Sequence, residues 1–112
     1  MAYMNQFSVS NGTADVTILA APAASTSRTI NAGAITIANN DTATINVTLQ
    51  INDNATDRSL YPDIEILAGD VWTNQKSIHC IDAVNQTVEI FLAAAVAVTE
   101  ASISVVYRDE AQ

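Results

Sequence analysis

Aliphatic and polar residues alternate along much of the chain. Between residues 44 and 52 every odd-numbered residue is aliphatic and every even-numbered residue is polar. Because successive side chains of a β-strand point to opposite faces, this pattern predicts a strand with one face on a core and the other in water. The same alternation recurs in residues 15–18, 34–37, 63–66, 87–92 and 100–107. Weaker strands are expected at residues 77–81 and near residues 7–10.

Turn-forming residues stand between these segments. Asn and Asp bond to nearby backbone groups and Gly tolerates positive φ, so all three favour turns. They occur in Asn11-Gly12, Asn39-Asn40-Asp41, Asp53-Asn54-Ala55-Thr56, Ala68-Gly69-Asp70 and Asn85-Gln86. We therefore predict an all-β chain in which residues 1–112 form one antiparallel β-sandwich domain of about seven or eight short strands. The strand order is expected to be jelly-roll-like or immunoglobulin-like.

Two stretches lack the alternation. Residues 20–27 are small and interrupted by Pro22, so we expect a loop between the sheets. Residues 92–98 have a helical composition, but they have no cap and are too few for an isolated helix. We interpret them as a hairpin connection between the last two strands.

The charge of the chain narrows its partners. Twelve acidic residues stand against four basic ones, which gives a formal net charge of −8. Phosphate binding needs clustered Lys and Arg, whereas the basic residues here are scattered, so no nucleic-acid partner is expected. An anionic membrane would repel the chain for the same reason. Mutual repulsion also discourages uncontrolled pairing of strand edges between copies.

The sequence offers no convincing catalytic group. His79 and Cys80 are the only histidine and the only cysteine, so no internal disulfide can form. As neighbours on a strand they point to opposite faces and cannot form a thiolate–imidazolium pair. We expect Cys80 to be buried and inert and His79 to be exposed or hydrogen-bonded. No catalytic residue, cofactor or small-molecule substrate is predicted.

A calcium site is the one metal site that the sequence leaves open. Asp53, Asn54 and Asp57 crowd one turn, and Asp63 and Glu65 follow. Their spacing does not match the ligand series of an EF-hand. Asp and Asn are also ordinary turn residues, so we interpret loop 53–57 as turn chemistry and predict no metal site.

Several residues are candidates for contacts with a partner. Arg28 and Arg58 each flank a predicted strand, either as exposed ion pairs or as contacts to the acidic loop of another subunit. Tyr61 and Trp72 flank a turn, either as a contact patch or as half-buried core residues. Residues 1–7 form a possible N-terminal arm. The full set of interface candidates is Tyr3, Met4, Phe7, Arg28, Arg58, Tyr61 and Trp72.

Five runs of the sequence carry a family resemblance. They are residues 16–23, which lead through residues 28–30 to residues 35–42, then residues 47–53, 56–60 and 66–72, and a closing β-hairpin completes the pattern. Together, between Asp15 and Tyr107, they resemble the small β-sandwich virion proteins of tailed bacteriophages, in particular the capsid decoration or cement class.

The resemblance implies a non-enzymatic structural protein that adds to the outside of an assembled shell and locks capsomers together. Its partners would be the major capsid protein and copies of itself, as a trimer or dimer. It would be made in the host bacterial cytoplasm and reside on the capsid exterior, with residues 1–7 ordered by strand addition. The alternatives are a neck or tail (head-completion) component of a phage, or a carbohydrate-binding or adhesin module.

Overall fold

The structure, a computed structural model, describes residues 3–80 and 85–111, and of Cys80 the backbone only. All regular structure in this part of the chain is β-strand. The strands are β1 (Met4–Ser10), β2 (Val16–Leu19), β3 (Thr26–Ile30), β4 (Ile35–Ala38), β5 (Ile45–Asp53), β6 (Thr56–Ile66), β7 (Val71–Thr73), β8 (Ile78–Cys80), β9 (Gln86–Leu92) and β10 (Ala101–Ala111). The described residues contain no helix that is long and apolar enough to cross a membrane.

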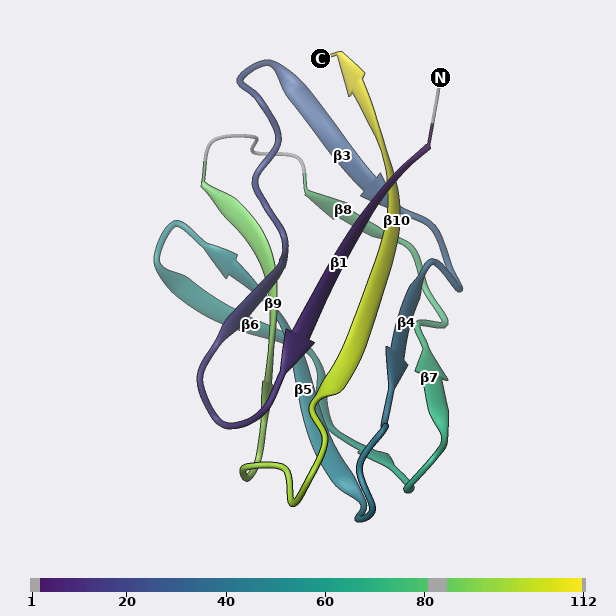
Figure 1. Cartoon of the computed structure of the whole chain (residues 1–112). Helices are drawn as coiled ribbons and strands as arrows, with labels where there is room; N and C mark the ends of the chain where they lie inside the picture. The colour runs from purple at the N-terminus through teal and green to yellow at the C-terminus, as the bar shows by residue number, and fades with distance from the viewer. Residues whose placement is uncertain (1–2, 81–84, 112) are drawn as a thin grey trace.

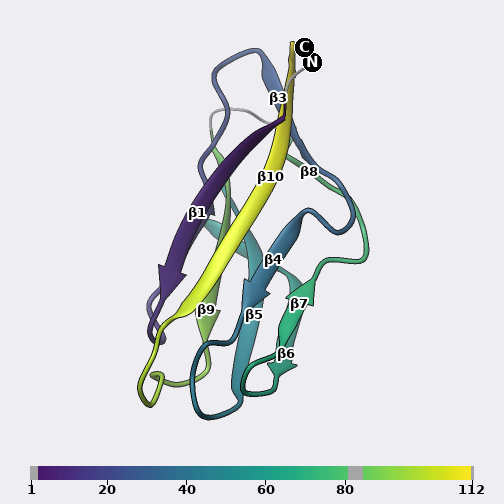
Figure 2. The same ribbon diagram turned by 45° about the vertical axis from the view of Figure 1, so that its right-hand side comes forward.

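The strands form two antiparallel sheets (Figures 1 and 2). In the first sheet β10 is central: β1 pairs with it along one side, and β4 and β3 pair with successive parts of it. β7 and β8 then pair with β4 and β3. The second sheet has the order β2-β9-β5-β6. This confirms the prediction of an all-β sandwich.

The strand order identifies the sandwich as a jelly roll. β3 and β4 act as one interrupted strand, since the Val106 amide donates to the Ala34 carbonyl between their ladders; β7 and β8 interrupt in the same way. With β3–β4 and β7–β8 each counted as one strand, the described part of the chain has eight strands. They pair as β1 with β10, β2 with β9, β3–β4 with β7–β8, and β5 with β6. Such nested pairs are an antiparallel ribbon rolled upon itself, which is the two-Greek-key sandwich. Of the two predicted topologies, the structure has the jelly roll.

The core lies between the sheets and is almost wholly aliphatic. The residues that alternation directs inward, such as Ile37 on β4 and Leu49 on β5, are fully buried. Removing apolar surface from water is the main stabilising term, worth about 1.5–3 kcal/mol for each fully buried aliphatic side chain. The buried apolar set is Ile18, Leu19, Ile30, Ile35, Ile37, Ile45, Val47, Leu49, Ile66, Ile78, Val88, Ile90, Leu92, Ala101, Ile103 and Val105.

One predicted connection was wrong, and one predicted strand is longer than expected. Residues 93–100 do not close a hairpin, because β9 and β10 belong to different sheets and the segment crosses between them. β6 begins at Thr56, well before the expected strand at residues 63–66. It forms a tight hairpin with β5 through Asn54 and Ala55, whose φ angles of 49° and 70° suit a two-residue turn.

The buried side chain of Asp41 links the two connections that cross between the sheets. Asp41 lies in the connection from β4 to β5 and is 6% exposed. Its carboxylate accepts hydrogen bonds from the backbone amides of Ala97, Val98 and Thr99, at 2.8, 2.8 and 3.1 Å. These bonds, led by the one from Ala97, lower the pKa of Asp41 to about 2. One carboxylate thus joins two segments that each run from one sheet to the other.

Candidate functional site

The alternation of β1 is inverted with respect to the core. Phe7 and Val9 point outward and are 73% and 48% exposed. Ser8 and Ser10 point inward, and their hydroxyl oxygens are buried without a hydrogen-bond partner among the described residues. Buried polar groups are rarely left unpaired, because the lost hydration is not replaced. β1 therefore shows apolar side chains to the solvent and polar ones to the core.

The outer face of the first sheet continues the apolar side of β1. Directly opposite residues of paired strands share a face, so the registers give its rows. One row is Val9, Ser102, Ala38 and Val71, the next is Phe7, Ser104, Thr36 and Thr73, and a third starts with Asn5 and Val106. None of these residues carries a charge, and we call them the uncharged face. A shallow hollow of about 390 Å³ beside Phe7 and Val9 lies on it.

The outer face of the second sheet is acidic. It carries Asp15, Asp57, Asp63, Glu65 and Glu89, and we call this set the acidic face. The carboxylates of Asp15, Asp57 and Glu89 come from three different strands or their flanks and have oxygens within 4.8 Å of one another. The Asn52 and Gln50 amides donate to Asp57 and Glu89 at 2.8 and 3.1 Å.

The predicted calcium candidates are dispersed by the fold. Asp53 accepts from Arg58 and Gln86, and these bonds, that from Gln86 first, lower its pKa. Asp57 instead joins the acidic face, and Asp63 accepts from Asn46 at 3.0 Å. The cluster that does form offers one ligand atom from each of three carboxylates, whereas calcium takes six to eight oxygens.

The two candidate arginines are bound within the chain. Arg28 donates to both oxygens of Asp109, at 2.7 and 2.9 Å, and to the Ala20 carbonyl at 2.8 Å. Its guanidinium also lies 4.4 Å from the ring centre of Tyr107. The hydrogen bonds from Arg28 lower the pKa of Asp109. Arg58 donates to Asp53 at 3.2 Å, as an exposed pair across the β5–β6 hairpin.

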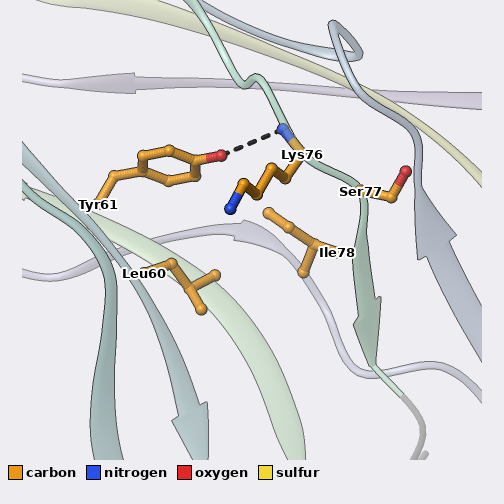
Figure 3. A pocket seen from close by; sticks show the side chains of 5 residues that line it. All are labelled: Leu60, Tyr61, Lys76, Ser77 and Ile78. Carbon is orange, nitrogen blue, oxygen red and sulfur yellow. Dashed lines mark hydrogen bonds between the residues drawn. The ribbon is translucent and has the colours of Figure 1, made fainter.

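Tyr61 and Trp72 meet at the opposite side of the sandwich from β1. Their rings pack edge to face with centres 5.0 Å apart, and both are half-buried against the core. The Tyr61 hydroxyl accepts from the backbone amide of Lys76 at 3.2 Å (Figure 3). Leu60, Tyr61, Lys76, Ser77 and Ile78 line a hollow of about 270 Å³ there. Its lining residues include one ammonium group, that of Lys76, and no carboxylate, imidazole or thiol.

Among the side chains that the structure describes, Thr29 is the one that contacts the ring of His79 through a hydrogen bond. His79 is exposed on β8, and its Nδ1 lies 3.1 Å from the Thr29 hydroxyl. The prediction that the Cys80 side chain is buried and inert lies outside the described residues.

The predicted interface residues thus fall into three groups. Tyr3, Met4 and Phe7 come together on or beside β1, and all three are exposed, at 58%, 39% and 73%. The arginines are engaged within the chain, and the Tyr61–Trp72 pair lies at the far edge. Residues 4–7 of the expected arm belong to β1.

Sequence reasoning did not single out the whole uncharged face. Its outward Ser and Thr residues look like any solvated face. The orientation of β1 was also missed, because alternation alone would direct Phe7 and Val9 inward. The only local signal was the absence of charge from Tyr3 to Ser10.

Solved structures with a similar fold include viral capsid proteins. A chain of the acidic stable capsid of Helicobacter pylori bacteriophage KHP30 superposes with a TM-score of 0.67 at 13% identity, covering 100% of this chain and 95% of that one. A chain of infectious bursal disease virus, strain Gx, matches with a TM-score of 0.53 at 13% identity, over 96% of this chain and 30% of that one.

A third similar structure comes from a pilus. A chain of the disulfide-linked pili of Bacillus endospore appendages matches with a TM-score of 0.54 at 15% identity, over 98% of this chain and 85% of that one. No protein-family model and no curated protein sequence matches the chain. At these identities the likeness establishes the fold, which is one found in capsid and pilus structures.

Proposed function

We propose that the protein is a non-enzymatic structural component of a bacteriophage virion that binds the outer surface of the capsid and stabilises contacts between capsomers. The observation that carries this proposal is the likeness to a chain of the KHP30 capsid, which extends over the whole of this chain and nearly all of that one. A chain of similar size and fold is thus part of a phage capsid structure.

The two outer faces support the same role. A protein that sits on a shell needs one surface for contact and another for solvent. The uncharged face supplies the first, since like-charged subunits can approach it without Coulomb repulsion. The acidic face supplies the second, since it keeps the surface hydrated. Its partners would be the major capsid protein and copies of itself, and the acidic face argues against nucleic acid.

Two alternatives make different predictions. A neck or tail component would be present in a ring of a dozen or fewer copies per particle. A carbohydrate-binding or adhesin module would need an exposed platform of rings, but Tyr61 and Trp72 pack edge to face and are half-buried. The exposed rings are Tyr3 and Phe7, and both lie at β1.

The test is the copy number and position of the chain in purified phage particles that encode it. Quantitative mass spectrometry should find hundreds of copies per particle. Gold-labelled antibody should bind intact particles over the whole shell. A dozen or fewer copies with label at one vertex would move the assignment to the neck or tail. Absence from washed particles would overturn the virion role.

A further inference from the structure

The four outer edges of the two sheets differ in how well they are guarded against pairing with another strand. Exposed edges are normally blunted by charges, proline, bulges or short length, because their free backbone groups invite a further strand. β6 contains Pro62, four charged residues and a bulged register. β2 is four residues long with a register shift. The edge of β7 and β8 is broken into two pieces of three residues.

β1 has none of these guards. It is seven residues long, contains no charge, proline or glycine, and keeps one continuous register with β10. Among the described strands it pairs with β10 only, and Figure 2 shows it at the margin of the molecule. Its other row of backbone groups forms no ladder with another described strand, although β2 of the second sheet packs near β1.

We propose that two copies of this chain associate by antiparallel pairing of β1 with the partner's β1, centred on Phe7. The pairing is isologous, which means that the same residues are used in both copies. The residue numbers of each directly opposite pair therefore sum to fourteen. Phe7 lies opposite the partner's Phe7 and Gln6 lies opposite the partner's Ser8. The two first sheets become one continuous sheet. This association does not depend on the virion role.

The side chains of β1 suit this register on both faces. On the outer face the two exposed Phe7 rings meet across the strand pair, where aromatic pairs add stability. On the inner face Gln6 lies opposite the partner's Ser8, so no charged side chains meet there. Phe7, which is exposed in one copy, is thus partly covered in two.

Charge selects a second copy as the occupant of this edge. Each copy carries a net charge of −8, and five of its carboxylates form the acidic face of the second sheet. Edge pairing of β1 with β1 joins the two uncharged faces side by side. A basic partner would be drawn to the acidic face instead, so the uncharged edge is where an identical acidic molecule meets the least repulsion.

The first test is the dimerisation of the full chain, measured by sedimentation equilibrium over a range of concentrations. Wild type should show a monomer–dimer equilibrium. Phe7→Glu should weaken it about tenfold or more, since it removes the ring pair and places two carboxylates opposite each other. Phe7 is mostly exposed, so this variant should keep its circular dichroism spectrum and its Tm. Val71→Glu, on β7 at the far edge of the same face, should leave dimerisation unchanged.

A second test reads the register by cysteine cross-linking in a Cys80→Ser background. Opposite residues in an antiparallel pair have Cα atoms about 4.5–5.5 Å apart, within reach of a disulfide. Phe7→Cys should therefore form a covalent dimer under mild oxidation. Asn5→Cys alone should not, because four residues, or about 14 Å, separate it from its copy. Mixing Asn5→Cys with Val9→Cys chains should restore the cross-link.

Each outcome decides the proposal. A chain that stays monomeric at the highest concentrations overturns it. So does a dimer that Val71→Glu dissociates as strongly as Phe7→Glu, because that result would indicate face-to-face packing. Equal cross-linking of the Phe7→Cys and Asn5→Cys chains would exclude the register.

Discussion

The two sheets share one core but present opposite outer surfaces. Inside, both contribute the same kind of side chain: Ile37 from the first sheet and Leu49 from the second are fully buried aliphatics. Outside, the second sheet carries five carboxylates, whereas the rows that contain Phe7 and Val9 on the first carry none. The fold explains the shared interior. The contrast outside concerns partners, because one surface repels identical copies and the other does not.

The two sheets also differ in how well their strands follow the alternation of apolar and polar side chains. The second sheet follows its alternation closely, with polar Thr48 outside and apolar Leu49 inside. β1 reverses the rule, exposing Phe7 and burying Ser10. Its unpaired inward hydroxyls reduce the stability of a single copy. Such a reversal makes physical sense if the strand is completed by another molecule.

The largest expected effect comes from releasing the connections that hold the two sheets together. Asp41→Ala removes the acceptor for three backbone amides of the loop before β10. We expect the Tm to fall by about 10 °C or more, measured by differential scanning calorimetry. Asp70→Ala, which removes an exposed charge from a nearby turn, should change the Tm little. If both variants melt alike, Asp41 does not join the sheets.

Acid should weaken the hydrogen bonds between Asp41 and the loop before β10. The pKa of Asp41 in the fold is about 2, below its ordinary value of 3.8. A lowered pKa contributes stability that is fully present above the ordinary value and is lost as the pH falls through the folded one. Wild type should therefore lose stability between about pH 4 and pH 2. Urea melts of Asp41→Asn should be less stable at pH 7 and vary less in that window; an equal pH slope would contradict this.

A smaller effect is expected from removing an unpaired inward hydroxyl of β1. Ser10 is 2% exposed and its hydroxyl has no described partner. Ser10→Ala removes the unpaired group, so the free energy of unfolding of the monomer should rise by about 1 kcal/mol in urea titrations. Ser59→Ala, on the exposed strand β6, should be neutral. Destabilisation by Ser10→Ala would mean that the hydroxyl is paired in solution.

The smallest effect is expected on the acidic face. Asp57→Asn removes one of three close carboxylates while keeping an acceptor for the Asn52 amide. Relief of repulsion should raise the Tm by about 1–2 °C at low ionic strength. The gain should vanish in 1 M salt, where exposed charges are screened. Glu100→Gln, away from the cluster, should show no salt-dependent gain. Destabilisation of Asp57→Asn that calcium chelation abolishes would reveal a bound cation instead.

Much of the fold could be predicted from the sequence because alternation is a local property. The alternation in residues 44–52 correctly predicts which side chains face the core. The turn predicted around Asn54 is the turn of the observed β5–β6 hairpin. Strand pairing is a long-range property, so the crossing of residues 93–100 between sheets had no local signature. The role of Asp41 could not be predicted for the same reason, because its hydrogen-bond partners lie more than fifty residues away in the sequence. An Asp that only forms a local turn would have the same neighbours in the sequence.

The candidate site was harder to predict than the fold. The sequence predicts Tyr3, Met4 and Phe7 as interface candidates, but it does not predict which face of β1 carries Phe7. Whether β1 presents Phe7 or Ser8 to the core depends on its register with β10. A shift of one residue would exchange the two faces. The absence of charge on the outer rows also becomes visible only when four strands are placed side by side.

Hydrogen exchange tests the central claim most directly, by comparing amides of the chain when dilute and when assembled. We expect new protection in β1, and unchanged exchange in peptides from β6 and β9 that carry the acidic face. Protection on the acidic strands with none in β1 would contradict the division of the molecule into a contact face and a solvent face.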